Sequence, residues 1–436
     1  MSINNQPATI NSVIILRARA VLPICRPAIE NGAVAFLGGR ILAVGRWKDA
    51  QKKFSGDVFD LGETVLLPGL INAHCHLDYT DMAGLFPPRK SFCDWIKLIT
   101  TEKSHWSFSD YATSWINGAK QLLHSGTTTV ADIEAVPELL PDVWDATPLR
   151  VLSLLEMTGV KSRRKPELIL RDTLDVLDEL PDKHSSGGLS PHAPYSTTPA
   201  LLRLVAAVAR KQKLRVATHI AESATEFEMF KRASGELHHW LENNNREMND
   251  CGGVSPVQLL ARHNALGPHL MAIHVNYLAR GDARLLAQNR TSVVHCPRSH
   301  DFFSHAEFPF ATLHRAGVNL CLGTDSLATV RKKPRQTIEL NMFDEMRAFA
   351  AKHEGVSPEI ILKMATVNGA RAIGQQGKLG ELKRNALADM IALPFSGDLG
   401  EASSAVLHHK GNVAVSLIGG EWAMGQPDIS KPKRCR

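Results

Sequence analysis

The sequence predicts a (β/α)8 barrel of residues 67–377 beside a small β-sandwich domain that combines residues 1–66 and 378–436. Eight short apolar runs alternate with longer stretches of helical period in the middle of the chain, and this alternation is typical of repeated βα units. Short strand-like runs with glycine turns lie on both sides of that region, which favours a β domain there. The structural alternative is a doubly wound α/β sheet.

The two flanking segments are expected to share one small domain. In the first segment we expect strands at residues 12–16, 33–36, 40–44 and 58–61. Gly38 and Gly39 mark a hairpin turn, because glycine accepts the positive φ angles of tight turns. In the last segment strands are expected at residues 389–393 and 413–418.

The barrel strands are assigned to the eight apolar runs, at residues 66–73, 128–132, 150–157, 188–190, 215–219, 270–274, 292–295 and 319–323. A helix over residues 111–124 is expected to end near Gly126, a typical C-terminal cap. Thr198 and Pro199 are expected to begin the helix that runs to residue 213. Further helices are expected at residues 279–289, 335–352 and 358–373.

Composition excludes several classes of protein. The chain has 436 residues, of which 44% are hydrophobic, and a formal charge of +6, so it is neither disordered nor a coiled coil. No apolar run reaches the roughly 18 residues of a membrane helix. The basic clusters at 331–333 and 431–436 lack interleaved aromatic residues, so we expect no nucleic-acid partner. Seven cysteines without a CxxC pair indicate reduced thiols and a cytoplasmic protein.

Polar residues follow most of the predicted barrel strands, where barrel enzymes place their active sites. The first strand is followed by His74-Cys75-His76, and the later ones by His192, His219 with Glu222, His274, His295 and Asp325. For each residue taken alone the alternative is structural: His219 or His274 would be a buried histidine with satisfied hydrogen bonds, and Asp325 would cap the next helix. Their common position at successive strand ends favours a shared site.

His74 and His76 are expected to point to the same side of their strand, because side chains alternate along a strand. Cys75 is then expected to point into the core. With His219 and Asp325, the pair makes a plausible site for one divalent metal ion. Three imidazoles and a carboxylate suit zinc, although iron or manganese accepts the same ligands.

A metal ion lowers the pKa of bound water towards neutrality and thereby supplies hydroxide. Hydrolysis then needs a group that takes a proton from the water and gives it to the leaving group. Glu222 suits that role, and the alternative is a surface residue that opens an acidic helix over 222–228. His274 and Asp325 are expected to orient the attacking oxygen.

These residues resemble those of the amidohydrolase superfamily, in its mononuclear deaminase and chlorohydrolase branch. The matching segments are residues 67–76 (LPGLINAHCH), 218–222 (THIAE), 273–274 (IH), 295–297 (HCP) and 322–326 (LGTDS). The resemblance implies that His74, His76, His219 and Asp325 bind the metal, that Glu222 is the general acid and base, and that His274 assists. Segment 187–195 lacks the lysine that bridges two metals in related barrels, which favours a single ion.

The substrate is suggested by a narrower resemblance to deaminases of adenine nucleosides. Residues 190–196 (SPHAPYS) resemble their substrate-reading segment, in which His192 would donate to a purine ring nitrogen. Glu102 is the nearest candidate for reading the ribose hydroxyls. Residues 72–80 and 237–242 resemble aminodeoxyfutalosine deaminases of the menaquinone pathway. Arg298 would then pair with a substrate carboxylate, or else form a structural salt bridge.

We therefore expect a metal-dependent hydrolytic deaminase of a 6-aminopurine nucleoside, with aminodeoxyfutalosine ahead of S-adenosylhomocysteine and methylthioadenosine. The alternative within hydrolysis is another heterocycle, such as a triazine. A non-catalytic binding protein is the third possibility, and the complete set of ligands argues against it. By family analogy alone the enzyme would be a homodimer.

Overall fold

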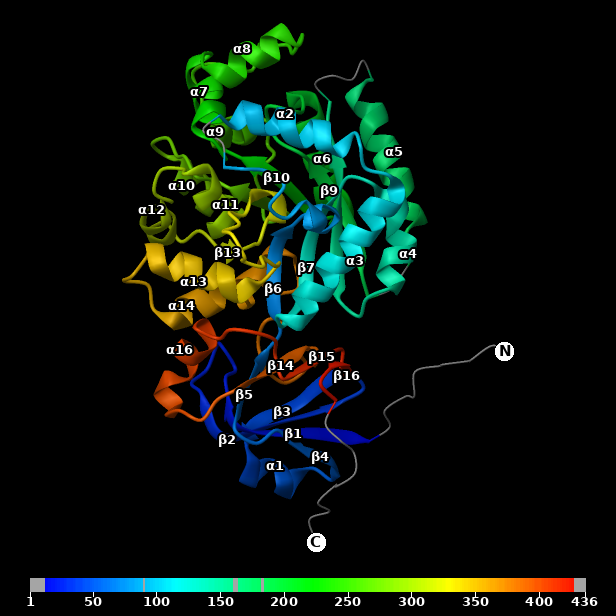
Figure 1. Cartoon of the computed structure of the whole chain (residues 1–436), viewed down its shortest axis with the longest axis vertical. Coiled ribbons are helices and arrows are strands. Elements are labelled where there is room, and N and C mark those ends of the chain that lie inside the picture. Colours follow the sequence, from blue (N-terminus) through cyan, green and yellow to red (C-terminus); the bar gives the residue numbers. More distant parts are fainter. Residues whose placement is uncertain (1–11, 89–90, 160–163, 182–183, 427–436) are drawn as a thin grey trace, which may run out of the picture.

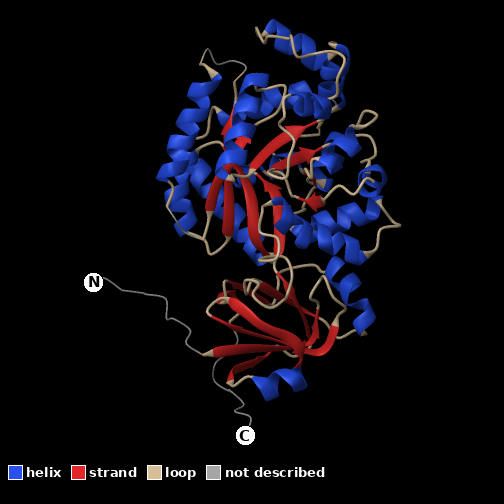
Figure 2. Ribbon diagram, turned by 180° about the vertical axis from the view of Figure 1, so that it is seen from behind, coloured by secondary structure: helices blue, strands red, loops and turns tan. Residues whose placement is uncertain are grey.

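The computed structural model describes residues 12–88, 91–159, 164–181 and 184–426. Figure 1 shows a barrel wrapped by helices above a separate β-sheet, and Figure 2 shows the same two parts from behind. The basic cluster at residues 431–436 lies outside the described residues. No helix within those described ranges has both the length and the apolar character needed to cross a bilayer. The six cysteines among them form no disulfide.

The small domain is one mixed sheet that both ends of the chain build. Its strands are β1 (Val13–Val21), β2 (Ile29–Leu37), β3 (Arg40–Arg46), β4 (Gly56–Asp60), β5 (Thr64–Pro68), β14 (Met390–Pro394), β15 (Val415–Ile418) and β16 (Glu421–Met424). β5 pairs antiparallel with β14, and this pairing joins the two ends of the chain. Gly38 and Gly39 have φ angles of 53° and 77°, so the expected hairpin between β2 and β3 is confirmed.

The barrel consists of eight parallel strands, each matching one predicted run. They are β6 (Leu70–Cys75), β7 (Thr127–Glu134), β8 (Arg150–Met157), β9 (Ser186–Pro191), β10 (Val216–Ile220), β11 (Leu270–His274), β12 (Ser292–His295) and β13 (Leu320–Leu322), in this order in the sheet. A parallel bridge between Cys75 and Asp325 brings the first and last strands together. The amide of Asp325 also donates to the carbonyl of His74 at 3.1 Å, which closes the barrel.

Most of the helices surround the barrel, and the first one packs against the small sheet (Figure 1). They are α1 (Trp47–Lys53), α2 (Phe92–Lys103), α3 (Phe108–His124), α4 (Leu140–Asp145), α5 (Pro166–Glu179), α6 (Pro199–Gln212), α7 (Ala224–Arg232), α8 (Glu236–Asn243), α9 (Pro256–Arg262), α10 (Asp282–Gln288), α11 (Pro297–Phe303), α12 (Phe310–Arg315), α13 (Met342–Lys352), α14 (Pro358–Met364), α15 (Val367–Ala372) and α16 (Ala402–Leu407). Thr198 caps α6 as predicted, by accepting the amide of Leu201. α2 lies across the end of the barrel remote from the small sheet (Figure 1).

Three boundaries expected from the sequence differ from the structure. The first apolar run, 66–73, spans two sheets, because the chain leaves β5 and enters β6 at Gly69. A Cβ at Gly69 would lie 2.1 Å from the hydroxyl oxygen of Thr128, so this crossing point accepts only glycine. The helix expected at 335–352 begins seven residues later, where Asn341 caps α13. The helix expected at 358–373 is split at Thr366, whose φ and ψ of −137° and −98° are not helical.

Candidate active site

Three buried histidines meet at the carboxyl ends of the barrel strands. His74 and His76 come from the end of β6, and His219 comes from β10. One ring nitrogen of each lies within 4.8 Å of the others. The ring of His74 lies 5.0 Å from that of His76 and 4.9 Å from that of His219. Cys75 is fully buried in the core, as strand alternation predicts.

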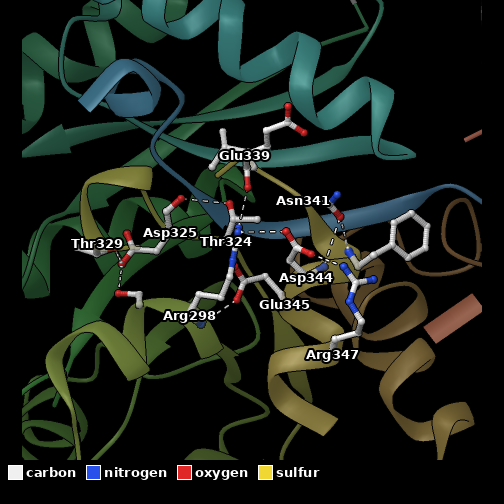
Figure 3. A network of polar contacts seen from close by, with 12 residues as sticks. Arg298, Thr324, Asp325, Thr329, Glu339, Asn341, Asp344, Glu345 and Arg347 are labelled. Carbon is white, nitrogen blue, oxygen red and sulfur yellow. Dashed lines mark hydrogen bonds and ion pairs between the residues drawn. The ribbon is translucent and has the colours of Figure 1, made fainter. Parts of the chain in front are cut away.

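Asp325 adds a carboxylate to this cluster. Its Oδ1 lies 3.6 Å from Nε2 of His74 and 3.7 Å from Nε2 of His76. Its Oδ2 accepts hydrogen bonds from the hydroxyls of Ser299 at 2.6 Å and Thr329 at 3.2 Å, and Figure 3 shows the contact with Thr329. The two hydroxyls leave Oδ1 directed at the imidazoles.

The strand β13 approaches β6 closely beside these ligands. A Cβ at Gly323 would lie 2.8 Å from the carbonyl oxygen of His74, so a larger residue would push the two strands apart. Asn72 holds the ends of β6 and β13 together, because its side chain donates to Thr324 Oγ1 at 2.8 Å and accepts from the Thr324 amide at 3.1 Å. These contacts fix Asp325 beside the two histidines of β6.

The hydrogen bond of His219 defines its tautomer. Nδ1 lies 3.0 Å from the carbonyl oxygen of His192, and a carbonyl can only accept, so Nδ1 carries the proton. Nε2 of His219 therefore keeps its lone pair and is free to act as a ligand. An outer hydrogen bond of this kind orients metal-binding histidines generally.

The donor set suits a divalent cation. His74 is 1% exposed and neither of its ring nitrogens has a hydrogen-bond partner among the described residues, an arrangement that is costly unless a ligand satisfies it. Burial lowers the pKa of His76 and His219 well below the usual value, so both are neutral. Burial alone would raise the pKa of Asp325, but the nearby imidazoles, His74 first among them, hold it well below its usual range.

Glu222 and His274 lie beside the ligand cluster. Oε1 of Glu222 is 3.7 Å from Nε2 of His274, and both side chains are buried. Burial, and secondly the charge of Asp325, raise the pKa of Glu222 well above its usual value. Burial lowers the pKa of His274 to about 3. Glu222 precedes α7 rather than belonging to it, so it is not the exposed start of an acidic helix.

The backbone around Glu222 and His274 is held in an uncommon conformation. Ala221, His274 and Asp325 have φ angles of 49°, 70° and 55°, a region that non-glycine residues seldom adopt. Glu226 stabilises the first of these turns by accepting the amides of Ala221 at 3.0 Å and Glu222 at 2.8 Å. The strained turns aim the side chains that follow the strands into the barrel mouth.

His192 lies next to His219, with ring centroids 4.8 Å apart. Its Nδ1 lies 2.6 Å from the hydroxyl oxygen of Ser196. When that hydroxyl donates, Nε2 of His192 carries the proton; when it accepts, Nε2 has a lone pair. The direction of the hydrogen bond with Ser196 therefore determines whether Nε2 of His192 donates to a ligand or accepts from it.

These side chains open into a cavity of about 380 Å³, a size typical of small-molecule sites. One end carries the polar cluster, and the remainder is largely aromatic and aliphatic. It is lined by His76, Tyr79, Trp95, Ile96, Ile99, Thr100, Lys103, Glu156, Thr158, His192, Tyr195, Ser196, His219, Glu222, Trp240, Leu241, His274, Asp325 and Ser326.

Two residues singled out from the sequence, Glu102 and His295, are absent from this lining. Glu102 turns away, and its carboxylate accepts the indole N–H of Trp106 at 3.2 Å, because Lys103 occupies the cavity face of the same helix. The structure therefore places Glu102, the expected reader of the ribose hydroxyls, outside the cavity lining. His295, at the end of β12, also lies outside and stacks on Phe308 with ring centroids 3.8 Å apart.

Arg298 forms the structural salt bridge that was the alternative to substrate binding. Its Nε donates to Glu345, its Nη1 lies 3.4 Å from Asp344, and its Nη2 donates to the carbonyl of Glu339 at 3.0 Å (Figure 3). Glu345 is fully buried, and its burial raises its pKa to about 7. These acceptors occupy the guanidinium and keep it from the cavity.

Several residues of the cavity lining were not predicted from the sequence. Glu156 is the second-last residue of β8, so the rule about strand ends applies to it as it does to His219. Lys103 lies on α2, in the segment that connects the barrel strands β6 and β7. The pattern of strand ends therefore does not point to it. Trp240 belongs to the aromatic segment 237–242, but the sequence does not indicate that it reaches the cavity.

Comparisons with known proteins agree with this fold. The model of the amidohydrolase family matches residues 65–423. A 5-methylthioadenosine/S-adenosylhomocysteine deaminase of Syntrophobacter fumaroxidans is 29% identical over 84% of this chain and 80% of its own.

Two solved structures share the architecture. One is an adenosine deaminase from Xanthomonas campestris with bound zinc, which has a TM-score of 0.80 at 24% identity over 94% of this chain and 92% of its own. The other is the aminofutalosine deaminase of Helicobacter pylori, with a TM-score of 0.82 at 23% identity over 94% of this chain and 99% of its own. Since the family model spans both the barrel and the strands that flank it, the chain belongs to the amidohydrolase family of hydrolytic enzymes.

Proposed function

We propose that the protein is a metal-dependent hydrolytic deaminase that releases ammonia from a 6-aminopurine nucleoside. The observation that carries the proposal is the grouping of three buried imidazoles, the Asp325 carboxylate and the Glu222 carboxyl around one cavity. The deaminase activity named for the relatives agrees with it.

In this proposal His74, His76, His219 and Asp325 hold one divalent metal ion, for which zinc is the first choice. Their lone pairs converge, and His219 presents Nε2 because its Nδ1–H is engaged. When bound, the metal would lower the pKa of a water molecule and so supply the nucleophile. Ser299 and Thr329 keep the Asp325 carboxylate oriented for this role.

Glu222 carries the proton. Burial raises the pKa of its carboxyl group well above the usual value, which favours transfer of a proton to this group. It takes the proton from the attacking water at one carboxylate oxygen and delivers it to the departing amino nitrogen, so that ammonia leaves as the bond from C6 breaks. His274, 3.7 Å away, stabilises charge on the attacking oxygen.

His192 positions the purine. Donation from Nε2–H to a ring nitrogen requires that the Ser196 hydroxyl donate to Nδ1, and their 2.6 Å separation allows it. The base would then lie with its amino group towards Glu222 and its ribose towards α2. Among nucleosides we favour aminodeoxyfutalosine, followed by S-adenosylhomocysteine and methylthioadenosine.

An ammonia-release assay tests the proposal. Zinc-loaded enzyme and enzyme stripped of metal are compared on aminodeoxyfutalosine, S-adenosylhomocysteine, methylthioadenosine and adenosine. We expect zinc-dependent release from at least one of them. If the enzyme binds one metal ion per chain but releases no ammonia from any of the four nucleosides, the assignment to nucleosides is overturned.

A further inference from the structure

Lys103 places its ammonium group on the wall of the cavity. It is the last residue of α2 and lines the cavity together with Trp95, Ile96, Ile99 and Thr100, which lie on one face of the helix. Among the described residues no carboxylate lies within 4.0 Å of its ammonium group. The chain therefore presents a positive charge to whatever fills the cavity.

Aromatic rings fix the position of this charge. The ammonium nitrogen lies over the ring of Tyr79, 4.8 Å from its centre. Tyr79 in turn stacks on His76 with centroids 5.3 Å apart and an interplanar angle of 8°. Lys103 is thus separated by one ring from a proposed metal ligand, and the cation–π contact favours that position.

The rest of the wall limits the charge that a ligand can carry there. Lys103 is the one lysine or arginine among the residues that line the cavity, and Glu156 lines it as well without forming an ion pair with Lys103. A doubly charged phosphate beside Lys103 would meet a single cation in a cavity that also contains the carboxylate of Glu156. A group with a single negative charge and an apolar body suits the surrounding Trp95 and Trp240 better.

We propose that Lys103 binds a carboxylate on the 5′ substituent of the nucleoside. This inference rests on the proposed function, because it takes the amino group to lie at Glu222 and the 5′ end towards α2. The carboxylate could belong to an aromatic acid or to an amino acid. Aminodeoxyfutalosine carries the first and S-adenosylhomocysteine the second, whereas methylthioadenosine carries neither.

The test compares kcat/KM for these three substrates in the wild type and in Lys103→Met. We expect the wild type to favour at least one carboxylate substrate over methylthioadenosine, and Lys103→Met to reduce that ratio by about tenfold to a hundredfold, as for loss of a charge-assisted hydrogen bond. Lys103→Arg should restore part of the ratio. The acid whose ratio falls more identifies the natural carboxylate.

Lys97→Met is the matched control, since Lys97 lies on the same helix, pairs with Asp94 and does not line the cavity; it should keep the wild-type ratio. Should Lys103→Met fail to fold, the wild type alone tests the idea: the carboxamide of the preferred substrate should lose a similar factor. An unchanged ratio in Lys103→Met, or equal turnover of acid and amide, would overturn the inference. If the enzyme still releases ammonia from methylthioadenosine, only the inference about Lys103 fails and the proposed deaminase function stands.

Discussion

The guanidinium of Arg246 donates through Nε to the backbone carbonyl of Tyr195 at 3.0 Å. The same side chain donates to the carbonyl of Pro194 at 3.0 Å and to both carboxylate oxygens of Asp250, at 2.7 and 2.8 Å. Arg246 is 6% exposed. The loop after α8 is thereby fastened to the segment that carries His192 and Ser196.

Arg246→Lys should loosen this attachment. A lysine ammonium cannot reproduce the planar set of donors, so we expect a loss of about 2–4 kcal/mol in the free energy of unfolding and a higher KM for the nucleoside. Urea unfolding and steady-state kinetics measure both effects. Arg203→Lys, at an exposed arginine that contacts His263, is the control. Equal stability and KM in the two variants would contradict the positioning role.

Glu222→Gln should retain the metal and lose activity. The amide keeps the size of the side chain but cannot take a proton from water, so kcat should fall on the order of 100-fold or more. Metal analysis should still give one ion per chain, because Glu222 is not among the proposed ligands. Turnover close to that of the wild type would show that another group carries the proton.

Glu156→Gln tests which carboxylate lies near the ribose. Glu156 lines the cavity, while Glu102 does not, so we assign the ribose hydroxyls to Glu156. The substitution should lower kcat/KM for adenosine by about tenfold, as expected for a hydrogen bond to a charged group. It should have less effect on 2′-deoxyadenosine. An equal loss on both nucleosides would remove this assignment.

The buried Glu226 should make stability depend on pH. Burial raises its pKa to about 7 from an ordinary value of about 4.5. Between these two pKa values the folded protein keeps a proton that the unfolded chain releases. The stabilisation of the folded state by protonated Glu226 is therefore complete below about pH 4.5 and is lost as the pH rises through about 7. The Tm of the wild type minus that of Glu226→Gln should therefore fall between pH 5 and pH 8.

Thermal unfolding at several pH values measures that difference. Glu228→Gln makes the same chemical change on the same helix, α7, and serves as the control. A difference for Glu226→Gln that stays constant from pH 5 to pH 8 would show that its carboxyl group titrates alike in the folded and unfolded chains.

Strand periodicity was enough to predict the barrel and to group the site histidines. His74, His219 and Asp325 follow runs whose apolar character requires a buried parallel strand, and parallel strands bring their carboxyl ends to one face. The boundary at Gly69 could not be read in the same way. An apolar run continues through it, and only the approach of Thr128 shows where one sheet ends.

The wall of the cavity was harder to predict. Lys103 depends on how α2 lies over the barrel, which is decided by packing between distant segments rather than by local pattern. Arg298 could not be assigned because its partner Glu345 lies 47 residues away. The sequence shows that a charge is present, but not whether another side chain already neutralises it.

The pairing of β5 with β14 has a consequence for biosynthesis. As the ribosome releases the chain, β5 emerges early, and its neighbour at residues 390–394 emerges more than 300 residues later. Until then one edge of the nascent sheet is open to other chains. A chain ended at residue 377 should therefore aggregate when expressed, and a monomeric product on size-exclusion chromatography would show that the edge is protected in another way.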